Sequence, residues 1–233
     1  MKALILAAGK GTRMRELTRE IPKPMIEVRG KPILQQIIEG IRDHTSIRDF
    51  FIITGYQAHV IEDYFQEGTD LGVSINYGLQ EIPDGTGRAP EIGKNWIGDT
   101  PFLLSYGDIL VDPNDYKRIT TAFSEEGVLT VRKGENLATG GAVVFDEHFY
   151  LKDLIEKAEP GTVNTPWYNA GIYGFKPCLF NYTAQLKKSA RGEYELTDAI
   201  RAMALDGQKI KGLELTGKWA DVRDPEVLAK LNH

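Results

Sequence analysis

The residues with the clearest chemical potential form a short loop near the amino terminus, Gly9-Lys10-Gly11-Thr12-Arg13. The loop directly follows an apolar run from Ala3 to Ala8, which is the pattern of a parallel strand buried on both faces. Two glycines at the end of such a strand let the backbone place its N–H groups against a phosphate. The sequence therefore predicts a phosphate-binding loop.

Two well-known phosphate motifs do not fit this loop. A Walker A loop has Lys and then Ser or Thr after its last glycine, whereas Gly11 is followed by Thr12 and Arg13. A dinucleotide-binding fingerprint has a third glycine where this chain has Met14, and an acidic residue at the end of the second strand, where it has Gly55. The loop therefore belongs to another class of site.

Basic residues gather around and after the loop: Lys10, Arg13, Arg15, Arg19 and Lys23. A solvated basic face is the ordinary explanation of such a run. A triphosphate, however, is bound by this same mixture of backbone N–H donors, planar Arg forks and Lys point charges. Lys23 lies between Pro22 and Pro24, which predicts that it is presented from a stiff, extended segment.

The composition excludes several classes of protein. A net charge of −5 over 233 residues argues against a nucleic-acid partner, although a local basic cluster can still attract an anionic small ligand. Cys178 is the single cysteine, so neither an intrachain disulfide nor a multi-cysteine zinc site can form. The chain has no signal-like start and no apolar run near the roughly 18 residues of a membrane span. We expect a cytoplasmic protein without a membrane partner, and the sequence leaves its oligomeric state open.

The order of strands and helices predicts an α/β fold with a mostly parallel sheet covered on both faces. The expected strands cover 3–8, 50–54, 73–78 and 101–108, and the expected helices cover 33–41 and 58–68. After about residue 125 the pattern changes to strands 127–133, 140–146 and 169–175, a helix at 195–207, a strand at 209–215 and a last helix from Pro225. No repeat or linker interrupts the chain, so we expect a single domain over 1–233.

Further polar residues lie before or between these elements. Asp108 ends a strand and Asp221 lies much further along the chain; if the fold brings them together, they offer the oxygen ligands that Mg²⁺ prefers. Glu156, Asn169 and Glu193 suit the recognition of hydroxyl groups, as on a sugar, with helix caps and turn bonds as the ordinary alternative. No Ser/His/Asp arrangement stands out, so nucleophilic catalysis has little support.

These residues, in this order, resemble the family of sugar-1-phosphate nucleotidyltransferases, and their motifs are most similar to those of the uridylyl- and thymidylyltransferases. The matching segments are 6–14 (LAAGKGTRM), 22–25, 28–34, 79–89 (LQEIPDGTGRA), 106–110, 156–157, 169–173, 192–200 and 219–222. The resemblance implies a Rossmann-like three-layer domain with a smaller sugar-binding lobe. It also implies transfer of a nucleotidyl group from an NTP to a sugar 1-phosphate, with release of pyrophosphate.

The resemblance also assigns roles to individual residues. The nucleotide would be bound by Leu6, Ala8, Gly9, Gly11, Thr12, Arg13, Gln80, Gly85 and Thr86, where Gln80 and Gly85 pair with uracil or thymine and so favour UTP or dTTP. The sugar phosphate would be bound by Gly141, Glu156, Lys157, Asn169 and Glu193. Arg13, Lys23 and Asp108 would be catalytic, and Asp108 and Asp221 would hold Mg²⁺.

Two other functions remain open at this point. One is a catalytically silent relative that binds sugar nucleotides as a regulatory subunit. The other is a phosphocholine cytidylyltransferase, whose aromatic cage for a quaternary ammonium could come from Trp167, Tyr168, Tyr173 and Trp219. Pro90 departs from the family pattern because it falls in a segment that is commonly helical. We expect no β-helix acyltransferase domain, which some relatives carry.

Overall fold

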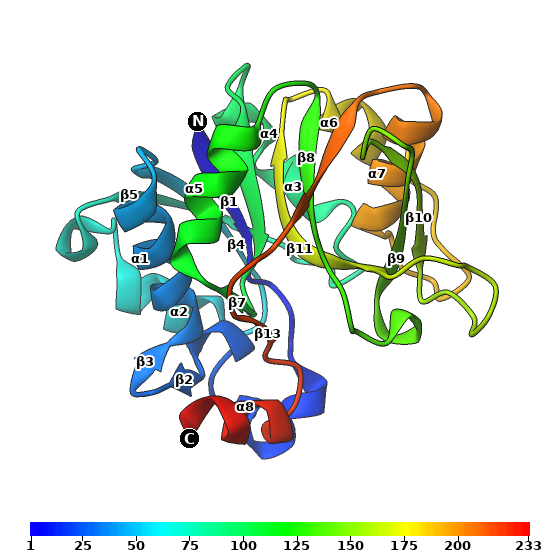
Figure 1. Ribbon diagram of the computed structural model, residues 1–233. Coiled ribbons are helices and arrows are strands. Elements are labelled where there is room, and N and C mark those ends of the chain that lie inside the picture. The colour runs from blue at the N-terminus through cyan, green and yellow to red at the C-terminus, as the bar shows by residue number, and fades with distance from the viewer.

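One large mixed sheet organises the chain (Figure 1), in a computed structural model that describes residues 1–233 except for the side chain of Arg15. The path of hydrogen-bonded neighbours runs β10-β9-β11-β6-β1-β4-β5, and β8 joins β11 to β12. The strands are β1 (Lys2–Leu6), β4 (Asp49–Thr54), β5 (Ser74–Leu79), β6 (Phe102–Tyr106), β8 (Gly127–Arg132), β9 (Gly141–Phe145), β10 (Leu151–Glu156), β11 (Trp167–Phe175) and β12 (Ile210–Glu214). Two small ribbons pair β2 (Glu27–Val28) with β3 (Lys31–Pro32), and β7 (Ile109–Val111) with β13 (Trp219–Asp221).

Helices cover both faces of this sheet. The α-helices are α1 (Ile33–His44), α2 (Ala58–Phe65), α3 (Ala89–Ile92), α4 (Lys94–Ile97), α5 (Pro113–Ala122), α6 (Leu179–Thr183), α7 (Leu196–Leu205) and α8 (Pro225–Asn232). Short 3₁₀ turns are η1 (Thr12–Thr18), η2 (Lys23–Met25), η3 (Thr69–Leu71) and η4 (Leu137–Thr139). Among the described helices, none combines the length and the apolar character that crossing a membrane requires.

The part of the sheet before residue 125 is parallel, as predicted. Strand β1 pairs in parallel with β4 and β6, and β4 pairs in parallel with β5. Beyond it, β11 runs antiparallel to β6, β8 and β9, and the hairpin of β9 and β10 extends the sheet as the smaller lobe, with α7 beside it (Figure 1). The α/β class is therefore confirmed, and the change of pattern seen in the sequence marks the start of the antiparallel part.

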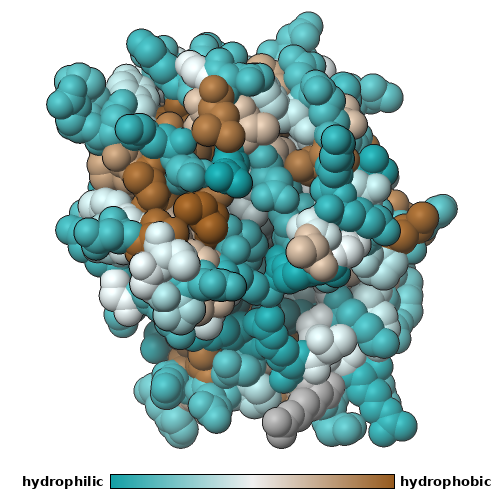
Figure 2. Space-filling view, turned by 90° about the vertical axis from the view of Figure 1, so that its right-hand side faces the viewer, coloured by the Kyte–Doolittle hydropathy of each residue, from teal (hydrophilic) through white to brown (hydrophobic). Residues whose placement is uncertain are grey.

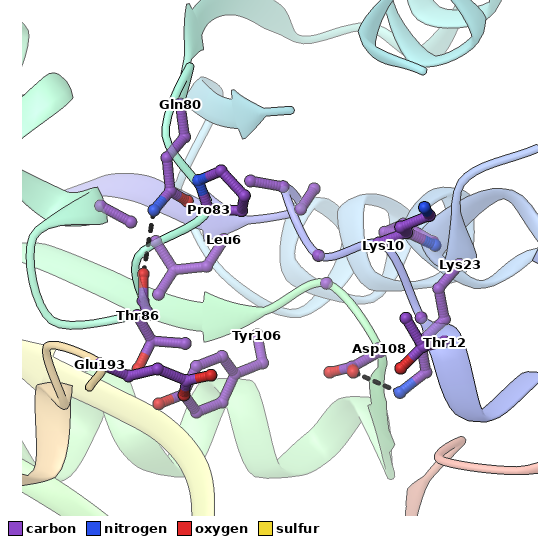
Figure 3. A pocket seen from close by; sticks show the side chains of 18 residues that line it. Leu6, Lys10, Thr12, Lys23, Gln80, Pro83, Thr86, Tyr106, Asp108 and Glu193 are labelled. Carbon is purple, nitrogen blue, oxygen red and sulfur yellow. Dashed lines mark hydrogen bonds and ion pairs between the residues drawn. The ribbon is translucent and has the colours of Figure 1, made fainter. Parts of the chain in front are cut away.

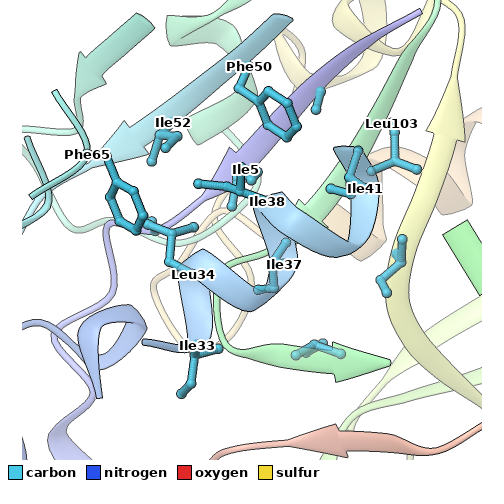
Figure 4. Packing of buried hydrophobic residues seen from close by; sticks show 14 of the residues in the cluster. Ile5, Ile33, Leu34, Ile37, Ile38, Ile41, Phe50, Ile52, Phe65 and Leu103 are labelled. Atoms are coloured by element: carbon cyan, nitrogen blue, oxygen red, sulfur yellow. The ribbon is translucent and has the colours of Figure 1, made fainter. Parts of the chain in front are cut away.

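The unbroken apolar run of β1 is explained by its central position. Because successive side chains of a strand point to opposite faces, Ala3 and Ile5 join one core while Leu4 and Leu6 join the other. The first core packs against α1, α2 and α5, and Figure 4 shows the isoleucines of α1 lying over β1 and β4. The second core packs against α3, α4, α6 and α7. The result is the predicted three-layer arrangement.

Several elements differ from the sequence-based expectation. Helix α5 and strand β10 were not expected, although Asp112 accepts a hydrogen bond from the N–H of Asn114 and Pro113 opens the helix, both ordinary start signals. Pro90 does not interrupt a helix but lies in the first turn of α3. Backbone N–H groups in the first turn make no hydrogen bond within the helix, so the lack of an N–H at proline costs nothing there. The extended conformation expected at Lys23 is wrong.

Lys23 instead opens the 3₁₀ turn η2. The N–H of Met25 donates to the carbonyl of Pro22 at 2.9 Å, and that of Ile26 donates to the carbonyl of Lys23 at 3.1 Å. Pro24 occupies a position whose N–H would have no partner in such a turn, so the two prolines are compatible with it. Lys23 is still held stiffly, but by a turn and not by an extended segment.

The packing of α1 gives a direct test of this core. Ile38 is fully buried between α1 and the sheet, so Ile38→Ala is expected to lower the free energy of unfolding by about 2–5 kcal/mol through lost burial and a residual cavity. Urea denaturation measures this change. The matched control is Asp63→Ala on the exposed face of α2, for which a change within about 0.5 kcal/mol is expected. Equal stability of the two variants would contradict the assigned packing.

Candidate active site

Two adjoining cavities lie at the carboxyl ends of β1 and β6. The first has a volume of about 390 Å³ and is lined by all but one of the residues predicted to bind the nucleotide, namely Leu6, Ala8, Gly9, Gly11, Thr12, Gln80, Gly85 and Thr86. The second, of about 290 Å³, is lined by Arg13, Asp108, Gly141, Glu156, Lys157, Asn169, Glu193 and Asp221. Figure 2 shows that this face of the molecule is hollowed near its centre, where hydrophilic side chains prevail.

The two cavities share part of their walls. Thr86, Tyr106, Asp108 and Glu193 line both of them. Arg13, expected among the nucleotide-binding residues, lines the second cavity and not the first. The structure thus brings together all the predicted site residues, in two groups that meet at these shared residues.

The Gly-rich loop forms the floor of the first cavity. Gly11 has a positive φ of 65°, and a Cβ there would come within 2.8 Å of the Cβ of Lys23, so a larger residue would displace the lysine. At Gly9, by contrast, an added Cβ would meet no protein atom within 4 Å. The space beside Gly9 is therefore open to a ligand, which could approach the backbone of the loop closely.

Lys23 lies at the centre of the charged part of the site. Its ammonium contacts the Asp108 carboxylate at 2.5 Å and lies 3.7 Å from the Asp221 carboxylate, while its own side chain is only 11% exposed (Figure 3). Figure 3 places Lys23 and Asp108 at one end of the first cavity and Gln80 at the other. The cavity therefore has a cationic end and an amide end.

The ribbon of β7 and β13 explains how two distant aspartates meet. Asp221 pairs with Ile109 across this ribbon, and the N–H of Val222 donates to the carbonyl of Asp108 at 3.0 Å. Burial and the neighbouring Asp108 charge raise the pKa of Asp221 to about 6, against the opposing effects of Lys23 and of two arginines. Two carboxylates therefore share one buried cation.

This pair of carboxylates fits a divalent metal ion that is completed by a substrate. No group of three or more His, Cys, Asp or Glu side chains suited to a metal occurs in the part of the chain that the structure describes. Mg²⁺ is commonly held by one or two carboxylates, with waters and substrate phosphates filling the other positions. The donor set of Asp108 and Asp221 matches that pattern.

The amide of Gln80 has a fixed orientation. Its Nε2 donates to the carbonyl of Gly85 at 2.9 Å and approaches the carboxylate of Asp84 at 3.5 Å. Because both partners are acceptors, the NH₂ group must face them. The Oε1 atom is consequently left to accept a hydrogen bond from a ligand in the first cavity.

The second cavity combines cations with buried carboxylates. The Arg191 guanidinium contacts Glu195 at 2.5 Å and lies 3.9 Å from Glu156. Burial and the Glu195 charge raise the pKa of Glu156, opposed by Arg191 and Lys157. Lys157 has a positive φ of 50°, and its N–H donates to the carbonyl of Gly140 at 2.7 Å, which turns the chain at the end of β10 toward the cavity.

Asn169 makes hydrogen bonds within the protein as well as lining the cavity. Its Nδ2 donates to the Tyr173 hydroxyl at 2.7 Å, and its Oδ1 accepts from the N–H of Gly171 at 3.2 Å. One N–H and one lone pair of the amide remain for a ligand. A Cβ added at Gly141 would come within 3.0 Å of the Cβ of Asn169, so the glycine leaves room for this side chain.

Sequence reasoning gave no role to four residues that line the second cavity, Tyr106, Arg191, Glu195 and Thr197, and it considered two others, Tyr168 and Trp219, only for an ammonium cage. Three of them neighbour Glu193, and their polar or charged character within 191–197 was an available signal. Glu195 and Thr197 are buried, and the Thr197 hydroxyl has no well-aligned hydrogen-bond partner among the described residues, whereas Glu193 is exposed. Only the fold shows which members of such a segment face inward.

The four aromatic residues considered for an ammonium cage do not converge. Tyr168 and Trp219 line the second cavity with an edge-to-face contact of 6.0 Å between ring centroids. Tyr173 is fully buried, and Trp167 packs with Phe149 outside the cavity at 5.2 Å. A cage needs several ring faces around one point, and two rings in edge-to-face contact do not supply them.

The raised pKa of Glu156 predicts how stability depends on pH. As pH rises past about 4.5, the ordinary pKa of Glu, the unfolded chain ionises this group before the folded chain does. The resulting destabilisation grows until the raised folded pKa is passed and persists in full above it. We expect Glu156→Gln to raise the melting temperature at pH 7 and to leave it unchanged at pH 4. Calorimetry at both pH values tests this, with the exposed Glu67→Gln as control.

Several known proteins resemble this chain in sequence. The bifunctional protein GlmU of Methanococcus maripaludis strain S2 is 37% identical to this chain, and the match covers 100% of this chain and 54% of that protein. The chain thus spans about half the length of the first of the curated relatives it matches. The UTP–glucose-1-phosphate uridylyltransferase AglF of Haloferax volcanii is 30% identical over 97% of this chain and 93% of its own length.

Solved structures share the fold over nearly the whole chain. A protein described as a glucose-1-phosphate thymidylyltransferase from Bacillus anthracis has a TM-score of 0.87 at 25% identity and covers 100% of this chain and 94% of its own. A UDP-glucose pyrophosphorylase in complex with UDP-glucose has a TM-score of 0.90 at 24% identity, over 99% and 96% of the two chains. The model of the family described as "Nucleotidyl transferase" matches residues 2–233. The chain therefore belongs to the nucleotidyl transferase family, whose members generally use a divalent metal ion.

Proposed function

We propose that this protein transfers a nucleotidyl group from a nucleoside triphosphate, UTP or dTTP by preference, to a sugar 1-phosphate and releases pyrophosphate. The observation that carries the proposal is the shared wall of the two cavities, with Lys23, Asp108 and Asp221 at the junction. Such an arrangement holds two phosphorylated substrates end to end. The relatives AglF and the UDP-glucose pyrophosphorylase support it through the substrates in their names.

The chemistry needs positioning and charge neutralisation, which this site supplies. With the triphosphate on the Gly-rich loop, an oxygen of the sugar phosphate would form a bond to the α-phosphorus, and the bond from that phosphorus to the bridging oxygen of the pyrophosphate would break. Lys23 would neutralise charge on the reacting phosphates, while Arg13 and Lys157 would hold the sugar phosphate in line. No protein nucleophile is required.

Asp108 and Asp221 would hold Mg²⁺ beside the phosphates. When bound, the ion would offset the negative charge of the triphosphate. The two carboxylates are already brought together by the ribbon of β7 and β13, so the protein supplies this pair without a rearrangement of its backbone. The Lys23 ammonium, which contacts Asp108 and lies 3.7 Å from Asp221, would offset the charge of the two carboxylates before the metal ion binds.

The fixed amide of Gln80 favours uracil and thymine. Its free Oε1 is an acceptor, and both bases present an imino N–H donor, whereas the corresponding ring nitrogen of cytosine is an acceptor. A cytosine in the same position would bring two acceptors together, which is unfavourable. This argues for UTP or dTTP over CTP, and so against a phosphocholine cytidylyltransferase.

The presence of every charged residue expected at the junction argues against a silent regulatory subunit. Arg13, Lys23, Asp108, Lys157 and Asp221 all line the two cavities. Burying a lysine between two carboxylates costs desolvation free energy that the ion contacts must offset. A protein that only binds a sugar nucleotide does not need such an arrangement. Turnover is therefore the function that this geometry supports best.

A pyrophosphate-release screen tests the proposed reaction. UTP, dTTP, CTP, GTP and ATP are each combined with glucose 1-phosphate, N-acetylglucosamine 1-phosphate and phosphocholine, with Mg²⁺ and again with a chelator. We expect metal-dependent release with UTP or dTTP and a sugar 1-phosphate, restored when Mg²⁺ is added back. Release with CTP and phosphocholine alone, or from no pair at all, would contradict the proposal.

Substitutions at the junction are expected to abolish turnover without unfolding the protein. Lys23→Ala and Asp108→Asn each remove a charge contact at the reacting phosphates, so turnover should fall at least about 100-fold. Initial rates of pyrophosphate release measure the effect, and circular dichroism checks the fold. The exposed Lys117→Ala and Asp63→Asn serve as controls that should retain full activity. Near-normal turnover in either junction variant would remove that residue from the mechanism.

The orientation of Gln80 predicts the choice of base. Gln80→Ala removes the acceptor that reads the imino N–H, so the ratio of kcat/KM for UTP to that for CTP should fall by about tenfold or more. The measurement compares both nucleotides at one sugar 1-phosphate concentration. Gln185→Ala is the matched control because this exposed glutamine lines neither cavity, so the ratio should stay unchanged. A ratio unchanged by Gln80→Ala would place the base elsewhere.

A further inference from the structure

The loop that follows Gln80 is joined directly to the segment 189–197, which lines the second cavity. The N–H of Gly87 donates to the carbonyl of Tyr194 at 2.7 Å, and the N–H of Tyr194 donates to the carbonyl of Asp84 at 2.8 Å. Gly85 also pairs with Tyr194 in an isolated parallel bridge. The two segments therefore hold each other as neighbouring strands do, although they are separated by about a hundred residues of chain.

The glycines of this loop are required by the close approach of the other segment. A Cβ at Gly85 would lie 2.3 Å from the Tyr194 carbonyl oxygen, and the φ of +116° already excludes most side chains. A Cβ at Gly87 would lie 2.8 Å from the carbonyl carbon of Glu195 and 2.5 Å from the side chain of Leu186. Gly87 lines neither cavity, so its constraint comes from the protein and not from a ligand.

A side-chain contact reinforces these backbone bonds. The Arg88 guanidinium lies over the ring of Tyr194, 3.9 Å from its centroid, and the Lys188 ammonium lies 5.6 Å from the same centroid. A planar guanidinium on an aromatic face is a favourable stacking and cation–π contact. Arg88 lines neither cavity and joins the loop to the segment from outside.

The joined segments carry side chains for different substrates. The loop supplies Gln80 and Thr86 to the first cavity. The segment supplies Arg191, Glu193 and Glu195 to the second, and the N–H of Leu196 donates to the Thr86 hydroxyl at 3.4 Å. A shift of one segment therefore shifts the side chains of the other cavity.

We infer that Gly87 and Arg88 are positioning residues that set the sugar-binding segment 189–197 against the base-reading loop, so that a nucleotide in the first cavity orders the second. The inference rests on the proposed function and deepens it. The physical basis is that a nucleotide bound to the loop restrains Gly85 and Thr86, and these restrain Tyr194 and Leu196 through the bonds described above. By linkage, a sugar phosphate in the second cavity must tighten the binding of the nucleotide by the same factor.

Hydrogen exchange measured by mass spectrometry tests this with UTP as the probe. In the unaltered protein, UTP should protect the amides of both 80–87 and 189–197. In Arg88→Ala protection of 80–87 should persist while that of 189–197 falls by about threefold to tenfold, the range expected for one lost cation–π contact. Gly87→Ala should have the same pattern because the added Cβ would push the two segments apart. Arg88→Lys, which keeps a cation over the Tyr194 ring, should recover part of the protection.

Steady-state kinetics on the same variants supply a second readout. For the substrate pair identified by pyrophosphate release, the KM for the sugar 1-phosphate at saturating nucleotide should rise about threefold to tenfold in Arg88→Ala, while the Kd for the nucleotide alone should change less than about twofold. The matched control is Lys209→Ala, which removes a cation from the ring of Tyr150, at 5.8 Å, away from both cavities. It should change neither readout.

The possible outcomes separate this inference from the proposed function. An enzyme that releases pyrophosphate normally but keeps full protection of 189–197 in Arg88→Ala and Gly87→Ala refutes the inference alone. Equal loss of protection in both segments also refutes it, because the loop would then simply be loosened. A protein that releases no pyrophosphate from any pair refutes the proposed function and the inference with it.

Discussion

The contact of Lys23 with Asp108 and Asp221 is the constraint on which the active site depends. A lysine that is 11% exposed would be costly to bury without a partner, and the carboxylates supply that partner at 2.5 and 3.7 Å. The three residues come from the turn η2, the turn after β6, and β13. The ion contact therefore ties the beginning, middle and end of the chain at one point, and this point is where the two cavities meet.

The charge balance at this point is incomplete, and that has a functional consequence. One ammonium faces two carboxylates, and the more distant of them, Asp221, keeps a raised pKa despite Lys23 and two neighbouring arginines. A divalent cation between the carboxylates would balance them better and would free the lysine for a phosphate. Under the proposed function, the arrival of a metal–triphosphate complex would exchange one set of ion contacts for another and would leave no charge buried and unpaired.

The sequence predicted the layers of the fold and named residues that line the two cavities, but it did not predict how those residues divide between the cavities. The apolar run of β1, the α1 pattern and the aspartates at strand ends are local signals, and each led to a correct element or a residue that lines one of the cavities. Helix α5 was not predicted because most of its residues are polar, so it lacks a clear apolar periodicity despite its start signals. The conformation of Lys23 was predicted wrongly because flanking prolines are compatible with both an extended segment and a 3₁₀ turn. The resemblance placed Arg13 with the nucleotide-binding loop, and in the structure Arg13 lines the second cavity while the rest of that loop lines the first. The spacing of residues in the sequence does not show toward which cavity a residue of this loop is directed.

The glycines illustrate why a motif alone does not define a role. Gly9 borders open space in the first cavity, Gly11 makes room for Lys23, and Gly85 and Gly87 make room for the backbone of Tyr194 and Glu195. The resemblance assigned Gly9, Gly11 and Gly85 to the nucleotide and gave Gly87 no role, because the absence of a side chain does not by itself show what a glycine makes room for. In the structure, only Gly9 leaves a space that no protein atom occupies. The other three shape the site by letting one part of the protein approach another, which is how a loop near one substrate can position side chains for the next.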